Sequence, residues 1–475
     1  MSMAQRPIVV VGAGKTGLSV ARHYARVGTA VLLTDRRSDD ELSPVRAALD
    51  VELGDARRLV AWETGGHRDA SFLNASLIVL SPGVPPLPGV VAAAAAGVKV
   101  TGEMDLAAQS LYSTFVGITG TNGKSTVTAL TGAIAVATGK PTFVGGNLGT
   151  PLTDAIGSPA GTAAGVCVVE MSSYQLETLD TLIPTAAAIL NITPDHLDRY
   201  GSMEGYADAK LRIATNMAHG STLVLSGDDE GVAIAMKRWA EQQRYSSVAD
   251  VGQTRGPSVY RFHSSPTSGA RLAFCEGHDF VLRLDHGEER YPRSLSHLMG
   301  AHNDRNVLAS LLLMRASGLA SPDAVREGLS GFHALAHRME LVAERAGIRY
   351  YDDSKATNVD SVVAGLAGFP VPFALIAGGR DKGGSYAPLV AALKSGTCRG
   401  VITIGEAAPL IEHALAESGL EWERAHDLAD GVRRARARVH VGEAVVLSPA
   451  CSSFDMFRDY AHRGAVFKEA AEQQS

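Results

Sequence analysis

Residues 115–126 read Phe-Val-Gly-Ile-Thr-Gly-Thr-Asn-Gly-Lys-Ser-Thr, and this stretch decides the fold of the chain. Its first five residues are typical of a buried strand, and we expect a helix to begin near Ser125. In the glycine turn between them, backbone N–H groups and the helix N-terminus can surround phosphate oxygens. The usual eight-residue pattern has glycine at position 118, where this chain has Ile118, so the loop is a shorter variant. We predict that it binds ATP, with Lys124 as a cation and Ser125 as a magnesium ligand.

The composition is typical of a multidomain globular enzyme. At 475 residues the chain exceeds what one hydrophobic core usually organises, and we expect three domains. With a net charge of -6 and scattered basic residues, the sequence does not indicate a basic surface that would bind nucleic acid. The four cysteines form no CxxC pair, which argues against zinc and disulfides and favours the cytoplasm. No apolar run approaches the roughly 20 residues of a membrane span, so we expect neither secretion nor insertion.

On the N-terminal side, the sequence predicts a Rossmann-like unit over residues 1–103. A strand at 8–11 runs into Gly-Ala-Gly-Lys-Thr-Gly at 12–17, then a helix and a second strand at 30–34 followed by Asp35. Further strands are expected at 77–80 and 98–100. This pattern fits a dinucleotide fingerprint, but the same geometry accepts any pyrophosphate, including that of a UDP-sugar. Nicotinamide binding therefore does not follow from it.

The glycine loop opens a central domain that we place at residues 104–334. Apolar strands are expected at 115–119, 166–169, 186–190 and 222–225, and polar residues follow three of them, as at the ligand edge of an open sheet. Residues 243–293 are expected to be irregular, with short antiparallel strands. Three residues allow both a functional and a purely structural interpretation. Glu170 is either a magnesium ligand or a solvated side chain or helix cap at the end of a strand. His196 and Lys210 are either functional residues, or a histidine in a loop hydrogen-bond network and a solvated helical lysine.

A third open α/β domain is expected over residues 335–475, with strands at 348–351, 373–377, 401–404 and 445–447. Polar clusters follow three of these strands. They should meet at one edge of the sheet, where such sheets bind ligands. Cys451 lies in the last cluster without an evident base, so we interpret it as a packed thiol. The clusters are 352–358, 378–382 and 448–455.

Several of these motifs together resemble the Mur ligases of bacterial cell-wall synthesis. The central ones are Gly117-Ile-Thr-Gly-Thr-Asn-Gly-Lys-Ser-Thr, Glu170-Met-Ser-Ser-Tyr-Gln-Leu-Glu177, Asn191-Ile-Thr-Pro-Asp-His-Leu-Asp198 and Lys210. Within the family, the D-glutamate-adding members are the most similar. The motifs that indicate them are Asp353-Ser-Lys-Ala-Thr-Asn358, Ser448-Pro-Ala-Cys-Ser-Ser-Phe-Asp455, Ser81-Pro-Gly-Val84 and the N-terminal glycine turn.

The resemblance implies a role for each matching residue. It assigns ATP to Gly120, Thr121, Asn122, Gly123, Lys124, Ser125, Thr126, Asn303, Asn306, Arg338 and Asp353. It assigns the UDP substrate, UDP-N-acetylmuramoyl-L-alanine, to Thr16, Gly17, Asp35, Arg37, Ser81, Gly83, Asn147 and His196. It assigns D-glutamate to Lys355, Thr357, Lys382, Ser453 and Tyr460, where some relatives have phenylalanine. Two magnesium ions are assigned to Ser125, Glu170, His196 and Lys210, the last as a carbamate. The catalytic set is Lys124, Glu170, His196, Lys210 and Arg338.

The implied reaction is ATP-dependent amide formation through an acyl phosphate, in cytoplasmic peptidoglycan precursor synthesis, by a monomer whose third domain closes on ATP. Three alternatives stay open from the residues alone. They are a related ligase that adds another amino acid or extends folate, a nicotinamide-dependent dehydrogenase and a non-catalytic nucleotide-binding protein.

Overall fold

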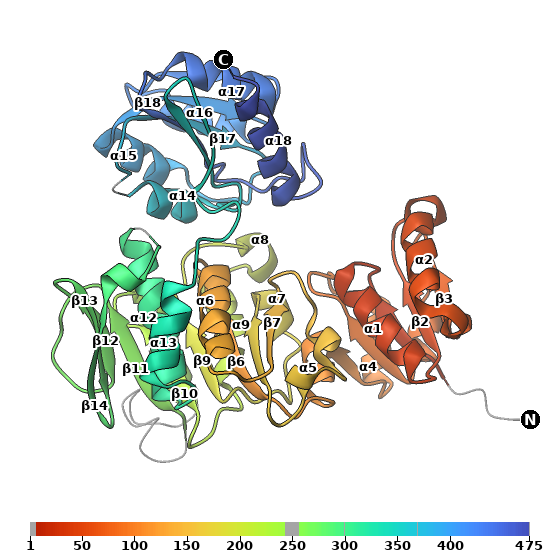
Figure 1. Ribbon diagram of the computed structural model, residues 1–475. Coiled ribbons are helices and arrows are strands. Elements are labelled where there is room, and N and C mark those ends of the chain that lie inside the picture. The colour runs from red at the N-terminus through yellow and green to blue at the C-terminus, as the bar shows by residue number, and fades with distance from the viewer. Residues whose placement is uncertain (1–5, 243–255, 299, 368, 475) are drawn as a thin grey trace, which may run out of the picture.

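The computed structural model describes residues 6–242, 256–298, 300–367 and 369–474, and its strands form three separate sheets of five, nine and six strands. The sheets follow one another along the chain, and helices flank each of them (Figure 1). The expected α/β class with three mostly parallel sheets is confirmed. No helix within the described ranges is long and apolar enough to cross a membrane.

The N-terminal unit is an all-parallel sheet in the order β3-β2-β1-β4-β5. Its strands are β1 (Ile8–Val11), β2 (Val31–Thr34), β3 (Val60–Glu63), β4 (Leu77–Leu80) and β5 (Val100–Gly102), and its helices are α1 (Lys15–Arg26), α2 (Asp39–Leu53), α3 (Asp69–Leu73) and α4 (Pro88–Ala95). A Cβ on Gly17 would lie 1.9 Å from the Gly12 carbonyl oxygen. Only glycine therefore allows α1 to start so close to the loop after β1.

The central unit is a nine-stranded sheet in the order β14-β13-β12-β11-β10-β9-β6-β8-β7. Its strands are β6 (Thr114–Thr119), β7 (Thr142–Gly146), β8 (Val166–Glu170), β9 (Ala186–Ile189), β10 (Thr222–Ser226), β11 (Ser258–His263), β12 (Leu272–Glu276), β13 (Asp279–Leu284) and β14 (Gly287–Pro292). The expected short antiparallel strands are confirmed for β12 to β14, whereas β11 extends the parallel part. Residues 243–255 of the stretch expected to be irregular lie outside the described residues.

Two apolar cores cover the two faces of the central sheet. On one face α6 (Lys124–Ala137), α12 (Ala301–Ala316) and α13 (Pro322–Ser330) pack together. On the other lie α5 (Glu103–Ala108), α7 (Ser173–Leu176), α9 (Met203–Leu211) and α10 (Glu230–Gln242). The inner strands β6, β8, β9 and β10 are almost fully buried, which explains their continuous apolar runs.

The C-terminal unit has the strand order β15-β16-β20-β17-β18-β19, with only β15 antiparallel. Its strands are β15 (Glu340–Arg345), β16 (Ile348–Asp352), β17 (Phe373–Gly378), β18 (Cys398–Ile404), β19 (Trp422–Arg424) and β20 (Ala444–Leu447), and its helices are α14 (Val359–Leu366), α15 (Ala387–Ser395), α16 (Ala408–Leu415), α17 (Leu428–Ala437) and α18 (Tyr460–Glu472). The segment after α13 leads into this unit, which lies over the end of the central unit that carries α8 (Leu197–Tyr200) (Figure 1).

Candidate active site

The glycine loop joins β6 to α6, as the sequence predicts. Ile118 is fully buried within β6, so the strand continues to Thr119 and the loop begins only at Gly120. Gly120 and Gly123 both have positive φ, at 150° and 84°. A Cβ on Gly123 would lie 2.5 Å from Asn306 Oδ1 of α12. Glycine at this position therefore permits both the turn and the close approach of α12.

Two lysines converge on one backbone oxygen of this loop. Lys124 Nζ donates to the Gly120 carbonyl at 2.9 Å and to the Thr121 carbonyl at 2.6 Å, and Lys210 Nζ of α9 donates to the same Gly120 oxygen at 2.8 Å. Burial lowers the pKa of Lys124. Burial, reinforced by the charge of Lys124, lowers the pKa of Lys210 well below its ordinary value. The site therefore favours a neutral amine at Lys210.

A carboxylate at the end of β8 lies in the same region. Glu170 Oε1 accepts a hydrogen bond from Asn147 Nδ2 at 2.7 Å, and the Glu170 side chain is buried. Its other oxygen, Oε2, is buried and finds no hydrogen-bond partner among the described residues. A buried carboxylate oxygen without a donor is costly. It is an available ligand for a hard cation such as magnesium.

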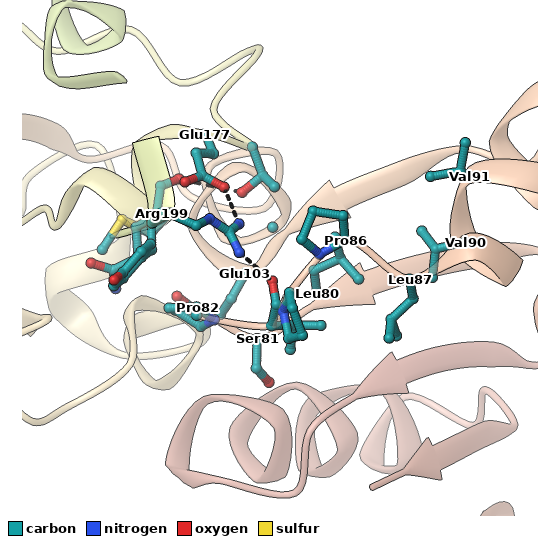
Figure 2. Close-up of a pocket in the computed structure, with 18 residues that line it drawn as sticks. Leu80, Ser81, Pro82, Pro86, Leu87, Val90, Val91, Glu103, Glu177 and Arg199 are labelled. Atoms are coloured by element: carbon teal, nitrogen blue, oxygen red, sulfur yellow. Dashed lines mark hydrogen bonds and ion pairs between the residues drawn. The ribbon is translucent and has the colours of Figure 1, made fainter. Parts of the chain in front are cut away.

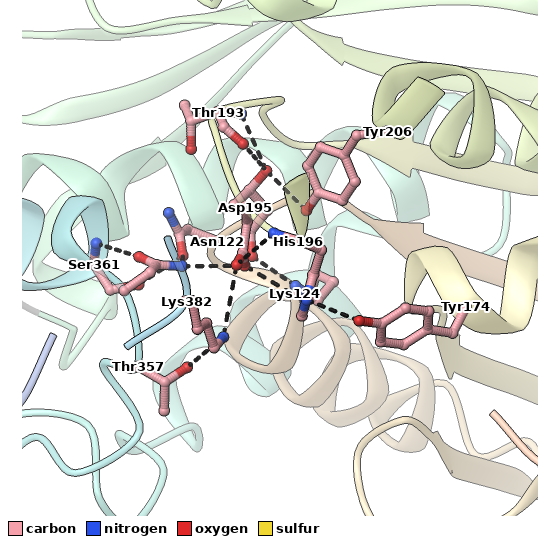
Figure 3. Close-up of polar contacts among 12 residues, drawn as sticks. Asn122, Lys124, Tyr174, Thr193, Asp195, His196, Tyr206, Thr357, Ser361 and Lys382 are labelled. Carbon is pink, nitrogen blue, oxygen red and sulfur yellow. Dashed lines mark hydrogen bonds and ion pairs between the residues drawn. The ribbon is translucent and has the colours of Figure 1, made fainter. Parts of the chain in front are cut away.

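His196 and its neighbour Asp195 form the polar centre of Figure 3. His196 has a positive φ of 54°, and its Nδ1 lies 2.9 Å from the Tyr174 hydroxyl. Burial lowers the pKa of His196, although Asp195 opposes the shift. Burial alone raises the pKa of Asp195, but Lys382, His196 and Lys124 more than offset it and the pKa is lowered. Asp195 is thus an anion at neutral pH among cations and a neutral imidazole.

The C-terminal unit contacts this centre directly. Lys382 Nζ lies 3.6 Å from Asp195 Oδ1 and 3.4 Å from Thr357 Oγ1. Asn358 caps α14 and donates to Asn122 Oδ1 of the glycine loop at 3.2 Å, and Ser361 Oγ donates to the same oxygen at 2.6 Å. The predicted D-glutamate residue Lys382 therefore contacts Asp195 of the central unit, and Asn358 and Ser361 contact Asn122 of the predicted ATP loop.

A cavity of about 790 Å³ lies between the central and C-terminal units beside these contacts, and seven predicted ATP residues line it. They are Asn122, Gly123, Thr126, Asn303, Asn306, Arg338 and Asp353. Asn306 Nδ2 donates to Asn303 Oδ1 at 3.0 Å, and Arg338 Nε is buried with no partner in the described part of the chain. Burial raises the pKa of Asp353 to about 7, against the lowering effect of the Ser448 hydroxyl that donates to Oδ2 at 2.6 Å.

Of the remaining predicted D-glutamate residues, Lys355 and Ser453 lie on loops and Tyr460 is the first residue of α18. Lys355 Nζ lies 5.1 Å from the centre of the Tyr460 ring, and burial lowers the pKa of this lysine to about 8. Ser453 is buried in the loop after β20. Arg463 of α18 is fully buried and donates to the Ser354 hydroxyl and carbonyl at 2.9 and 2.8 Å and to the Cys451 carbonyl at 3.2 Å. It therefore ties two of the three polar clusters together.

The predicted UDP-substrate residues fall on both sides of a unit boundary. Asp35 Oδ2 accepts from the Ala13 N–H at 2.7 Å and from the Arg37 guanidinium at 2.8 Å. Burial alone raises the pKa of Asp35, but these bonds reverse the effect and hold it far below its usual range. Thr16 and Gly17 open α1. Ser81 and Gly83 line a second cavity, of about 220 Å³, between the N-terminal and central units (Figure 2). Asn147 and His196 belong to the central unit.

Three models of protein families match successive parts of the chain: the Mur ligase MurD-like N-terminal domain at residues 6–102, the Mur ligase middle domain at 118–314 and the Mur ligase glutamate ligase domain at 337–451. The chain belongs to the Mur ligase family. It is 42% identical over 466 residues to a protein of Syntrophotalea carbinolica, covering 98% of this chain and 97% of that one. It is 41% identical over 480 residues to a protein of Myxococcus xanthus, covering 99% of each. Both are named UDP-N-acetylmuramoylalanine--D-glutamate ligase.

Solved structures with the same fold include other Mur ligases. UDP-N-acetylmuramate-alanine ligase MurC of Thermotoga maritima matches with a TM-score of 0.61 at 18% identity, over 99% of this chain and 100% of that one. E. coli FolC in complex with DHPP and ADP matches with a TM-score of 0.54 at 16% identity, over 78% of this chain and 92% of that one. At such identities the likeness shows the fold alone.

The sequence analysis of this Mur ligase missed several residues that the structure brings into the site. Asp195 could have been proposed, because it directly precedes His196 in a polar cluster. Asn358 also lay within a cluster singled out above, and its position before an apolar helix is typical of a cap. Ser361 and Arg463 gave no signal, since each is a single polar residue on a helix whose partners come from elsewhere in the chain.

Proposed function

We propose that this Mur ligase joins D-glutamate to the alanyl carboxylate of UDP-N-acetylmuramoyl-L-alanine, with hydrolysis of ATP to ADP and phosphate. The single observation that best supports this is the 3.6 Å ion pair between Lys382 and Asp195. This pair brings a residue of the C-terminal unit that is proposed to bind D-glutamate next to His196 and the glycine loop. The relatives named for this reaction, at 41–42% identity over nearly the whole chain, support the same substrates.

ATP is proposed to lie in the 790 Å³ cavity, with its phosphates on the glycine loop that lines one part of it. Lys124 now donates to two carbonyls of its own loop, and phosphate oxygens would replace those acceptors. The guanidinium of Arg338, whose Nε has no described partner, is suited to the γ-phosphate. Asn303, Asn306 and Asp353 line the same cavity and are proposed to contact the nucleoside.

Magnesium is proposed to be held by Ser125, Glu170, His196 and a modified Lys210. The donor set fits, because Glu170 Oε2 is a buried carboxylate oxygen without a partner and the pKa of His196 is lowered toward the neutral form that binds metals. When bound, magnesium would neutralise phosphate charge. Asn147 holds the other Glu170 oxygen and so fixes the direction in which Oε2 points.

Lys210 is proposed to carry a carbamate. Its pKa is lowered, which provides the neutral amine that attacks carbon dioxide, and the reaction releases one proton and forms an N-carboxylate. The product places an anion beside Lys124 in the position of a neutral amine. This exchange would add an attraction to Lys124 and would supply an oxygen ligand for a metal ion.

The proposed chemistry requires no protein nucleophile. The alanyl carboxylate attacks the γ-phosphorus, ADP leaves, and an acyl phosphate forms. The D-glutamate amine then attacks the acyl carbon and displaces phosphate. Lys124 and Arg338 counter the charge that gathers as two anions approach, and the closed C-terminal unit keeps water from the acyl phosphate.

The two organic substrates are proposed to approach from opposite units. The uridine diphosphate lies on Thr16, Gly17, Asp35 and Arg37, and the rest of the molecule passes Ser81 and Gly83 to reach Asn147 and His196. The two carboxylates of D-glutamate bind Lys355, Lys382, Thr357, the loop of Ser453 and the first residue of α18, Tyr460, which supply cations and N–H or hydroxyl donors.

The functional division proposed for the chain is a UDP-substrate domain at 1–103, an ATP domain at 104–334 and a D-glutamate domain at 335–475. The enzyme is proposed to act as a cytoplasmic monomer in peptidoglycan precursor synthesis.

The test is phosphate release from ATP and magnesium in the presence of UDP-N-acetylmuramoyl-L-alanine. D-glutamate is compared with L-glutamate, L-alanine and a diamino acid. Release with D-glutamate alone is the expected result. Release with a different amino acid would keep a ligase but change its substrate, and release with none would leave a nucleotide-binding protein.

A further inference from the structure

Several side chains join the N-terminal and central units of the chain. Glu103 directly follows β5, and its Oε1 accepts from the N–H and the hydroxyl of Thr153 in the central unit, both at 2.6 Å. Ser19 and Arg22 of α1 bind Asp154 at 2.5 and 3.2 Å. A further contact is made by Arg199 of α8, which follows the polar cluster around His196.

Arg199 bridges a side chain of its own unit and the backbone of the neighbouring one. Its Nη2 donates to Glu177 Oε2 at 2.7 Å, and its Nη1 donates to the Val84 carbonyl at 3.4 Å (Figure 2). Tyr200 donates to the other Glu177 oxygen at 2.6 Å, and the guanidinium lies 5.6 Å from the centre of the Tyr174 ring. The carboxylate and the ring fix the guanidinium in one orientation, with one edge turned to the N-terminal unit.

The bridge forms one wall of the 220 Å³ cavity between the two units. The opposite wall is the loop of residues 81–87, which contains Ser81 and Gly83 as well as Val84. A guanidinium is a planar fork, so it can bind a carboxylate with one nitrogen and a carbonyl with another. A lysine ammonium in the same place would carry the charge but could not hold both partners in that geometry.

We propose that Arg199 is a positioning residue that latches the loop of residues 81–87 onto the central unit and thereby selects the inter-unit arrangement that binds the UDP substrate. The inference rests on the proposed function, in which that substrate touches Asp35 in one unit and His196 in the other. A latch that favours one arrangement raises the affinity of a ligand that spans both units. It leaves the affinity of a ligand confined to one unit unchanged.

The experiment compares two probes on the full-length enzyme by calorimetry. UDP alone should occupy only the N-terminal unit, whereas UDP-N-acetylmuramoyl-L-alanine should span both. For Arg199→Lys we expect the dissociation constant of the full substrate to rise about five- to tenfold, on the order of one charge-assisted hydrogen bond, and that of UDP to stay within about twofold. The KM values for ATP and D-glutamate and the kcat should stay within about twofold, because Arg199 touches no reacting group.

The matched control is Arg212→Lys. Arg212 donates to the carbonyls of Leu176 and Leu179, both at 2.7 Å, so it supports the same end of α7 that carries Glu177 while both of these partners lie in the central unit. This variant should bind both probes as the wild type does. Glu177→Gln, which removes the negative charge and one of the two acceptor oxygens, should reproduce the Arg199 effect, and combining it with Arg199→Lys should add little.

Several results would overturn the latch. Unchanged binding of the full substrate would show that Arg199 does not influence the arrangement, and an equal loss for UDP would show local damage to the loop. The same loss in Arg212→Lys would assign the effect to α7. Failure of the wild type to bind the full substrate would instead contradict the proposed function, and the proposed role of Arg199 would then be contradicted as well.

Discussion

Replacement of Lys210 by alanine tests the most unusual feature of the site, which is the pair of lysines on one carbonyl. The two ammonium nitrogens lie 2.8 and 2.9 Å from the Gly120 oxygen, so they can be no more than about 5.7 Å apart. If both were protonated, their repulsion at an effective dielectric constant of about 20 would be about 3 kcal/mol. A carbamate on Lys210 would replace this repulsion with an attraction of similar size.

Lys210→Ala should fold normally, because Lys124 still donates to the Gly120 carbonyl, but it should lose the anionic group. We expect kcat for phosphate release to fall by about 10²- to 10³-fold, as for other single electrostatic groups in active sites. A small carboxylic acid such as acetate or propionate should restore part of the activity, because it can place an anion in the space left by the side chain.

The assay is phosphate release at saturating substrates, with the acid titrated into both the variant and the wild type. Lys237→Ala, which removes an exposed lysine from α10, is the control and should neither lose activity nor respond to the acid. Wild-type turnover in a folded Lys210→Ala variant would refute the argument. So would a folded, inactive variant that no carboxylic acid rescues.

Three further predictions follow from charges in the site. Lys124→Ala should lower kcat by about 10²-fold or more in the phosphate assay with the fold retained by circular dichroism, and near-normal turnover would remove Lys124 from the phosphate site. The pKa of Lys355 is about 8, so kcat/KM for D-glutamate should fall as the pH rises through 8, and Lys355→Arg should move this fall to higher pH. A pH-independent kcat/KM would contradict that role. The pKa of Asp353 is raised from 3.8 to about 7, so the native state binds more protons than the unfolded state between these values and stability falls as pH rises. Asp353→Asn should lack this loss of stability, so its melting temperature relative to that of the wild type should increase from pH 5 to pH 8. A difference in melting temperature that does not change with pH would refute the raised pKa of Asp353.

The strands that could be predicted from the sequence are those with continuous apolar runs. β8 and β17 are buried along their whole length, and a parallel strand covered on both faces must be apolar throughout. β3, β15 and β19 were missed because they lie at sheet edges and expose part of their side chains. Within these strands the apolar runs span no more than three residues, so no long run marks them. The gap in the sequence prediction is therefore a consequence of position in the sheet.

The individual site residues could be proposed for a similar reason. Glu170 and Asp353 follow buried strands directly, and the topology of an open sheet places such residues at its ligand edge. What the sequence does not contain is which side chain of one unit meets which of another. The contact of Ser361 with Asn122 depends on the path of the chain after α13 and on the angle between two sheets. Neither is encoded in a local pattern.

The contact between Lys382 of the C-terminal unit and Asp195 of the central unit affects how the enzyme can act. Burial raises the pKa of Asp195, and Lys382 of the C-terminal unit is the largest of the charges that lower it; Lys382 in turn has Thr357 as a neighbour. A D-glutamate carboxylate bound as proposed would compete with Asp195 for Lys382. In the proposed binding mode, binding of the amino acid is therefore coupled to the charge on the cluster of Asp195 and His196. Such coupling suits the proposed reaction through an acyl phosphate, because the cation proposed to bind the last substrate also joins the two units around it.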